Sequence, residues 1–291
     1  MPGLYDRAIE DLGNIVGLEH VNTTIPDQQL ATLFYIAGLG LTRDPFIMVS
    51  TNNIWANVGR SQFHLPTNKP QVLRGHVGLV LPEREPLLRR LEAVRKPLAG
   101  TLFDFQDHEE FVEAVSPWGN RFRCYEPHER FGRITLGMPY VEFQVPIGTA
   151  EGIARFYRQV MNAPATVSLE DGRHARVAVG IDQDLIFRES AEPQPPYDGH
   201  HVQIYVANFS GPYRRLLEMG LITEESDQHQ YRFKDLVDPE GGKSLYTLEH
   251  EVRSMRHPLF GRPLINRNPA QSNVHYAPGY DAWNWHMERA D

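Results

Sequence analysis

Short segments in which apolar and polar residues alternate recur along most of the chain, and each predicts a half-buried β-strand. Residues 18–26 alternate in this way and stop at a proline, after which Asp27 can cap a helix over residues 28–37. Short strands follow, and the last of them covers residues 61–65. The first part of the chain is therefore predicted to be a strand, a helix and then further strands.

The same order of elements returns along the rest of the chain. Residues 75–81 alternate as a strand, and residues 84–94 have the spacing of an amphipathic helix that leads into three more short strands. The pattern begins again at Met138, since residues 138–146 match residues 18–26, and His201 occupies the place of His76. Matches in the same order indicate a tandem duplication in which each half is itself doubled.

The composition is that of a globular protein and excludes several classes. A chain of 291 residues with 41% hydrophobic residues suggests two domains, and a net charge of -8 offers no basic surface for nucleic acid. No apolar run has the roughly 18 residues of a membrane helix, and the first residues lack the pattern of a signal peptide. We therefore expect a cytoplasmic protein that binds a small molecule, and neither nucleic acid nor membrane.

The residues that could bind a metal ion are histidines on predicted strands. Cys124 is the single cysteine, which excludes an internal disulfide and a thiolate cluster. His64 lies near the end of one predicted strand and His76 near the start of another, and neutral imidazole on a rigid strand is a ready metal ligand. A strand histidine also serves as a hydrogen-bonded core residue, so both interpretations stay open.

Four short motifs occur in an order typical of one superfamily. They are the strand with Leu18-Glu19-His20, the strand with Gly75-His76, and the turns Pro-Trp-Gly-Asn and Asp-Pro-Glu-Gly that lead into final strands. With these motifs, residues 18–250 resemble the vicinal oxygen chelate superfamily, which includes glyoxalase I, extradiol dioxygenases and bleomycin-resistance proteins. The resemblance implies an α+β fold of two tandem domains, each made of paired β-α-β-β-β modules that curl into a cup.

The predicted boundaries follow from this resemblance. Residues 1–17 are a lead-in, residues 18–128 the first vicinal-oxygen-chelate domain, and residues 138–251 the second. Residues 252–291 form a tail rich in proline and aromatic residues, with too many aromatic side chains for a free disordered segment. We expect the tail to pack across a domain or a partner subunit, with the further hypothesis that it covers the opening of a cup.

The resemblance also assigns ligand positions to the first, fourth, fifth and eighth strands of each cup. In the N-terminal cup these positions are held by His20, His64, His76 and Arg123, and in the C-terminal cup by Tyr140, Glu189, His201 and Tyr246. The three N-terminal histidines are the predicted metal site, with Fe(II) favoured and zinc, manganese and nickel as alternatives. Arg123 replaces a glutamate ligand of the family, which favours a substrate anion there or a site without metal.

Further residues of the two cups are predicted to contact the substrate. Arg123 and Tyr125 share one strand face and are the predicted catalytic residues, because they can hold negative charge on a substrate; a solvated strand edge is the alternative. Trp55 and Asn57 alternate along a strand expected to line the N-terminal cup, although tryptophan is also common in cores. The predicted substrate-binding residues of the C-terminal cup are Glu189, His201 and Tyr246.

The resemblance implies a metal-dependent enzyme that acts on a small substrate with vicinal oxygens. The length of the chain favours a dioxygenase-like reaction on a catechol or enolisable compound. The C-terminal His-His-Glu site of extradiol dioxygenases is broken here by Tyr140 and Tyr246, although Glu142 lies on the Tyr140 face. A glyoxalase-type lyase or isomerase is one alternative, and a metal-free small-molecule binding or resistance protein is another. A homodimer is a further expectation.

Overall fold

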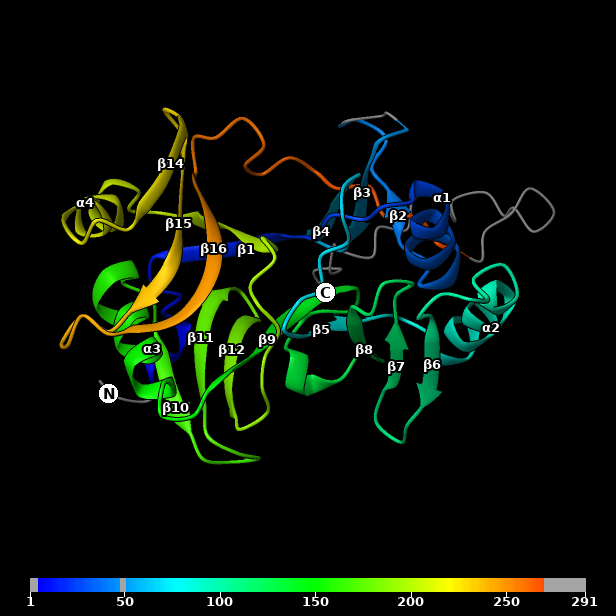
Figure 1. Cartoon of the computed structure of the whole chain (residues 1–291), viewed down its shortest axis with the longest axis horizontal. Helices are drawn as coiled ribbons and strands as arrows, with labels where there is room; N and C mark the ends of the chain where they lie inside the picture. The colour runs from blue at the N-terminus through cyan, green and yellow to red at the C-terminus, as the bar shows by residue number, and fades with distance from the viewer. Residues whose placement is uncertain (1–4, 48–50, 270–291) are drawn as a thin grey trace.

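Residues 5–47 and 51–269 are described in the computed structural model, and they form two eight-stranded mixed sheets with few helices (Figure 1). The α+β class and the fourfold recurrence of one β-α-β-β-β module are confirmed. Among the described residues, none of the helices is long and apolar enough to cross a membrane.

The four modules have the same order of elements. The first contains β1 (Ile15–Asn22), α1 (Gln28–Ala31) with the π-helical turn Thr32–Gly38, β2 (Thr42–Arg43), β3 (Asn53–Val58) and β4 (Ser61–Pro66). The second contains β5 (Gly75–Val80), α2 (Arg84–Arg95), β6 (Asp104–Asp107), β7 (Val112–Val115) and β8 (Arg121–Tyr125). The third contains β9 (Gly137–Pro146), α3 (Ala150–Phe156) with the π-helical turn Tyr157–Met161, β10 (Ala165–Ser168), β11 (His174–Gly180) and β12 (Gln183–Ser190). The fourth contains β13 (His201–Val206), α4 (Ser210–Glu218), β14 (Ile222–Asp227), β15 (Gln230–Val237) and β16 (Ser244–Ser254).

Local sequence signals account for the first helix of the chain. The Asp27 side chain accepts hydrogen bonds from the backbone N–H groups of Gln29 and Leu30, at 2.8 and 3.0 Å, and so caps α1 as predicted. The expected helix over residues 28–37 is present, but its second part is a π-helical turn that ends at Gly38. The amphipathic helix expected over residues 84–94 is α2, with Leu87, Leu91 and Val94 buried.

Each sheet combines strands from both halves of the chain. The strand order of one sheet is β14-β15-β16-β13-β1-β4-β3-β2, and that of the other is β10-β11-β12-β9-β5-β8-β7-β6. We call them the β1–β13 sheet and the β5–β9 sheet after their central antiparallel pairs. The first module therefore shares a sheet with the fourth, and the second with the third. This pairing corrects the expectation that each half of the chain closes a cup of its own.

Modules that are neighbours in the chain meet instead through their apolar faces. The rings of Phe34 and Phe63, from the first module, lie 5.4 and 5.6 Å from the ring of Phe122 in the second. The ring of Phe143 in the third module lies 6.2 Å from Tyr246 in the fourth. Aromatic residues supply large apolar areas to such contacts, so the core lies between the two sheets. The polar faces of both sheets are left to form binding sites.

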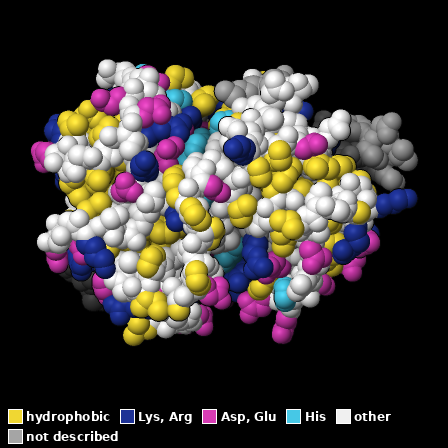
Figure 2. Space-filling view, viewed as in Figure 1, with side chains coloured by type: hydrophobic (Ala, Val, Ile, Leu, Met, Phe, Trp, Pro, Cys, Tyr) yellow, Lys and Arg dark blue, Asp and Glu magenta, His cyan; other side chains and the backbone are white. Residues whose placement is uncertain are grey.

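Polar and charged side chains collect on the faces turned away from this core. His20, Gln62 and Gln203 are fully buried on the β1–β13 sheet, although burial of polar groups is costly unless they are paired. Figure 2 shows histidine gathered with basic and acidic side chains at two places near the middle of the molecule, one above the other. These two polar faces hold the candidate functional side chains of the described residues.

The described part of the tail crosses the β1–β13 sheet within the same chain (Figure 1). The Phe260 ring packs 4.9 Å from the Tyr205 ring of β13, and an Arg262 guanidinium nitrogen lies 2.8 Å from the Asp44 carboxylate. The Asn57 side chain donates a hydrogen bond of 2.8 Å to the Ile265 carbonyl oxygen. The aromatic residues Tyr276, Tyr280, Trp283 and Trp285, which motivated the tail prediction, lie outside the described residues.

The sheet pairing makes a prediction about fragments of the chain. A fragment of residues 1–136 contains β1 and β5 but lacks β13 and β9, so each sheet would end in an unpaired central strand. We expect this fragment to aggregate when expressed alone and to recover a folded state when co-expressed with residues 137–291. Size-exclusion chromatography and circular dichroism report the result, with the intact chain as control. Cooperative unfolding of the isolated 1–136 fragment would contradict the strand pairing.

Candidate metal centre

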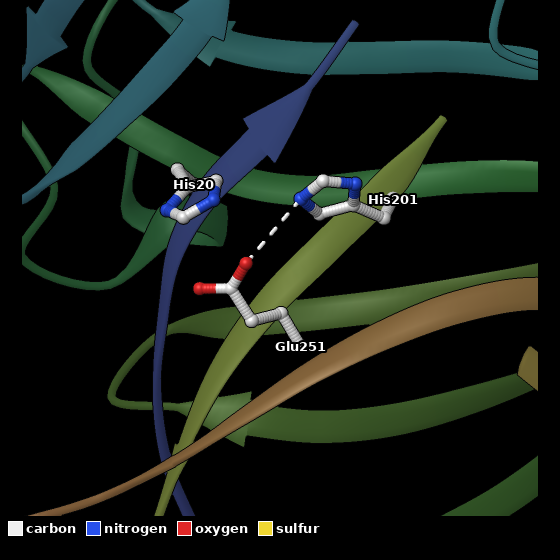
Figure 3. A group of neighbouring side chains, drawn as sticks. All are labelled: His20, His201 and Glu251. Atoms are coloured by element: carbon white, nitrogen blue, oxygen red, sulfur yellow. Dashed lines mark ion pairs between the residues drawn. The ribbon is translucent and has the colours of Figure 1, made fainter. Parts of the chain in front are cut away.

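Three side chains with metal-ligating atoms meet on the polar face of the β1–β13 sheet (Figure 3). His20 comes from β1, His201 from β13 and Glu251 from β16, and these three strands are neighbours in the sheet. One ligand atom from each lies within 4.8 Å of the others, and all three residues are buried. His201 Nε2 lies 3.6 Å from Glu251 Oε2, the pair joined by the dashed line in Figure 3. The arrangement is two imidazoles and one carboxylate around a common point.

Each imidazole has a carboxylate on its Nδ1 side. His20 Nδ1 lies 3.2 Å from Glu19 Oε2, and His201 Nδ1 lies 3.5 Å from Glu249 Oε1. The Nε2 atoms of both histidines are buried and have no hydrogen-bond partner among the residues described. A carboxylate next to Nδ1 keeps the ring proton there and leaves the lone pair of Nε2 available. Both rings are therefore prepared to act as ligands through Nε2.

The protonation state of His20 suits this role. Burial lowers the pKa of His20, because the charged imidazolium loses its hydration, and this effect exceeds the opposing influence of Glu19 and Glu251. A lowered pKa keeps the imidazole neutral at physiological pH. The neutral ring is the form that binds metal.

Glu251 is held by two arginines. Arg232 Nη2 makes a short ion pair with Glu251 Oε2, and Arg253 Nη2 lies 2.6 Å from Oε1. Burial opposes ionisation of Glu251, but the pair with His201 and the charges of Arg253 and Arg232 outweigh it and lower its pKa. The carboxylate is therefore ionised and fixed in place. Two imidazoles with unpartnered Nε2 atoms and one ionised carboxylate fit a divalent metal ion.

His64 and Trp55 lie beside the three ligands. The His64 ring is 5.7 Å from the His20 ring and stacks on Trp55 at 3.9 Å with an interplanar angle of 13°. Burial, with the nearby His20 and His201, lowers the pKa of His64 to about 2. The Asn53 amide nitrogen lies 3.0 Å from His64 Nε2 and can only donate, so the ring proton is on Nδ1. His64 thus belongs to the wall of the site.

The structure does not bring the three predicted metal ligands together. His20 and His64 lie on the β1–β13 sheet, whereas His76 lies in β5 on the other sheet. His76 Nε2 is 3.1 Å from the Tyr140 hydroxyl, and its Nδ1 is 4.0 Å from Glu142 Oε1. The reason for this correction is that the chain leaves one sheet after β4 and enters the other at β5. Arg123 and Tyr125, in β8, lie on the His76 sheet for the same reason.

The predicted substrate-binding residues have diverse surroundings. Trp55 lies at the metal centre, 5.0 Å from the His20 ring, and His201 is one of the three grouped ligands. Asn57 is buried and holds the tail, and Glu189 Oε1 accepts a hydrogen bond of 2.9 Å from the Ala150 N–H at the start of α3. Tyr246 is packed in the core, with the Arg74 guanidinium 4.2 Å from its ring centroid. The contacts of Asn57, Glu189 and Tyr246 are those of structural residues.

Glu251 and Glu19 are not among the site residues predicted from the sequence. Alignment of the last strand of one half with the last strand of the other assigned Tyr246 to the ligand position of the eighth strand. The two strands differ in length, however, since β16 has 11 residues and β8 has 5. The longer strand carries the acidic residues Glu249 and Glu251 two positions apart, hence on one face. This alternation, next to the His201 strand, was the signal that could have identified the carboxylate.

Removal of the Glu251 charge is predicted to destabilise the protein without metal. In Glu251→Gln, Arg232 and Arg253 each lose a buried charged partner, and we expect the free energy of unfolding to fall by about 2 to 4 kcal/mol. Denaturant unfolding of chelator-treated protein measures the change. The control is Glu85→Gln, which removes an exposed partner of Arg89 and should leave the free energy of unfolding nearly unchanged. Equal effects of the two substitutions would refute the inferred network.

No protein-family model and no curated protein sequence matches the chain. Two solved structures are similar to it over most of their length. A Bacillus subtilis protein named only as a candidate dioxygenase has a TM-score of 0.57 at 14% identity, covering 87% of this chain and 92% of its own. Glyoxalase I from Zea mays has a TM-score of 0.57 at 12% identity, covering 86% and 95%. At these identities the likeness concerns the fold, and the chain has the vicinal oxygen chelate fold that its motifs predicted.

Proposed function

We propose that the chain is a metal-dependent enzyme whose ion is bound by His20, His201 and Glu251. The observation that carries this proposal is the convergence of two buried, unpartnered imidazole Nε2 atoms on one ionised carboxylate. Two histidines and one carboxylate would supply three ligands to the ion, a donor set typical of iron(II) oxygenases. Fe(II) is therefore the favoured ion, with zinc, manganese and nickel as alternatives.

The proposed reaction is dioxygenase-like, on a small catechol or enolisable compound with two neighbouring oxygens. A bound Fe(II) ion would supply a Lewis acid and a redox centre. The protein supplies orientation: Glu19 and Glu249 hold the imidazole rings, and the two arginines hold Glu251. Similar solved structures include a candidate dioxygenase and a glyoxalase, which supports this reaction class.

The wall of the site suits a flat substrate. Trp55 and His64 stack on each other next to His20 and offer an aromatic surface beside the ligands. His64 carries its proton on Nδ1, and its low pKa makes it a poor proton acceptor, so its part is to donate a hydrogen bond. A cavity of about 480 Å³ between β1 and the tail reaches Glu19, the carboxylate behind His20.

A glyoxalase-type isomerisation is the second candidate. It requires a carboxylate that moves a proton next to the metal. Glu249 lies 3.5 Å from His201 Nδ1, behind the imidazole and away from the proposed ion, which makes the isomerisation less favoured than the dioxygenase-like reaction. Oxygen uptake separates the two reactions. Catechol should be consumed with O₂ by the Fe(II)-loaded protein, whereas turnover of the methylglyoxal–glutathione hemithioacetal without O₂ would favour the isomerase.

Metal content tests the site itself. We expect about one transition-metal ion per chain in anaerobically purified protein, measured by plasma mass spectrometry, and loss of that ion in His201→Ala. The matched variant is His76→Ala, which removes an equally buried strand histidine from the other sheet and should keep the ion. Metal retained by His201→Ala, or lost from His76→Ala, contradicts the ligand set. No metal in the wild type after reconstitution would favour the metal-free binding protein.

The carboxylate behind His20 is predicted to set the affinity for metal. Glu19→Gln keeps the shape of the side chain but weakens its hold on His20 Nδ1, and we expect a roughly 10- to 100-fold weaker metal affinity with unchanged stoichiometry at saturation. Competition with a chromophoric chelator measures the affinity. Glu110→Gln, at an exposed ion pair with Arg130, is the control. An unaltered affinity in Glu19→Gln would show that this carboxylate does not support a ligand.

A further inference from the structure

A second cavity lies on the polar face of the β5–β9 sheet, separate from the metal ligands. Its volume is about 630 Å³, and a neighbouring cavity of about 450 Å³ shares wall residues with it, including Arg123, Glu142 and Arg188. The wall of the larger cavity contains four arginines and three carboxylates. One positive charge therefore remains after all carboxylates are balanced.

Three of the four arginines are already engaged. Arg188 forms a bidentate pair with Glu142, with nitrogen–oxygen distances of 2.8 and 2.9 Å. Arg121 Nη1 lies 3.8 Å from Glu113 Oε1 on the next strand. Arg74 donates a short hydrogen bond to a backbone carbonyl oxygen of β16 and lies over an aromatic ring. Arg188 and Arg121 are therefore paired with carboxylates, whereas Arg74 keeps its positive charge and is held by neutral groups.

Arg123 is the fourth arginine, and its guanidinium is left without a polar partner. Among the described residues, no hydrogen bond or ion pair involves its side chain, which lies over the Phe111 ring at 5.0 Å from the centroid. Glu113 is its neighbour in the β7–β8 register, but the carboxylate is paired with Arg121. Because Arg123 borders both cavities, its planar fork of N–H donors is available to a ligand.

Neutral hydrogen-bonding groups line the same region. His76 Nε2 lies 3.1 Å from the Tyr140 hydroxyl, which lies 2.9 Å from the Tyr125 hydroxyl. Gly78 makes this possible, since a Cβ atom there would be 2.2 Å from the Tyr140 ring. Burial lowers the pKa of His76 to about 4 and raises the pKa of Tyr140, so neither carries charge at neutral pH. The two hydrogen bonds of this hydrogen-bonded chain use two of its three protons, so one neutral donor remains free for an anion, either His76 Nδ1–H or Tyr125 O–H.

Comparison of the two sheets sets this cavity apart from the metal centre. The strand β12 has the same place in its sheet that β16 has in the other, third from one edge. β16 contributes the carboxylate of Glu251 to the three proposed metal ligands, whereas β12 contributes the guanidinium of Arg188 to the cavity on the other sheet. A guanidinium at this place disfavours a metal ion by charge repulsion. Equivalent strand positions on the two sheets therefore have opposite preferences for charge.

We propose that the cavity on the β5–β9 sheet binds a small oxyanion, a carboxylate or a phosphate, through Arg123, with the His76–Tyr140–Tyr125 chain as the source of one neutral donor. Both ligand types match a fork of guanidinium N–H groups. This binding is independent of the proposed metal-dependent reaction, because the residues that carry it lie on another sheet.

Isothermal titration calorimetry on the full chain tests the proposal, with malonate and inorganic phosphate as probes at constant ionic strength. We expect saturable binding of at least one probe, at least about tenfold weaker in Arg123→Gln. The probe that binds with the higher affinity shows whether the site prefers a carboxylate or a phosphate. Arg214→Gln removes an exposed arginine of α4 and should bind as the wild type does. His201→Ala should also bind normally, even after loss of the metal ion.

Three results would overturn the proposal. They are the absence of saturable binding of both probes to the wild type, equal affinity in Arg123→Gln, and loss of binding in His201→Ala. The last result would move the anion to the metal centre. Arg123→Lys keeps the charge but removes the fork, and it provides the decisive comparison if Arg123→Gln does not fold. We expect several-fold weaker binding of malonate by this variant, and unaltered binding would equally reject a guanidinium site.

Discussion

The antiparallel pairing of β1 with β13 is the interaction on which the candidate site depends. It places His20 and His201 on neighbouring strands, although one lies near the start of the chain and the other in its second half. The parallel pairing of β13 with β16 then brings Glu251 to the same point. Since strand backbones fix the direction of their side chains, the three ligand atoms are positioned by the sheet and not by a mobile loop.

Buried charged groups are tolerated when each has a partner, and the β1–β13 sheet provides these partners in a dense network. Glu19, Glu249 and Glu251 face Arg232, Arg253 and the two histidines. The network gives each ligand a partner on the side away from the proposed ion. The buried polar atoms of this face that lack a hydrogen-bond partner include the Nε2 atoms of His20 and His201, which converge with the Glu251 carboxylate.

The second sheet uses the same arrangement of strands for a different balance of charge. There the carboxylate Glu142 is already neutralised by Arg188, and Arg123 retains an unpaired guanidinium. A duplicated scaffold thus offers one face that attracts a cation and one that attracts an anion. The residues that carry the two sets of charges lie on different sheets, and the apolar core lies between them.

The sequence by itself determined the modules, since alternation, helix spacing and the Asp27 cap are local properties, and its motifs were sufficient for the vicinal oxygen chelate fold. It also identified His20, His64, His76 and His201 as inward-facing strand histidines. The tertiary structure alone decided which modules share a sheet, and so grouped His20 with His201 and Glu251 and left His76 beside Arg123. The physical reason is that every edge strand offers the same backbone hydrogen bonds, so the choice of partner depends on packing between segments far apart in the chain.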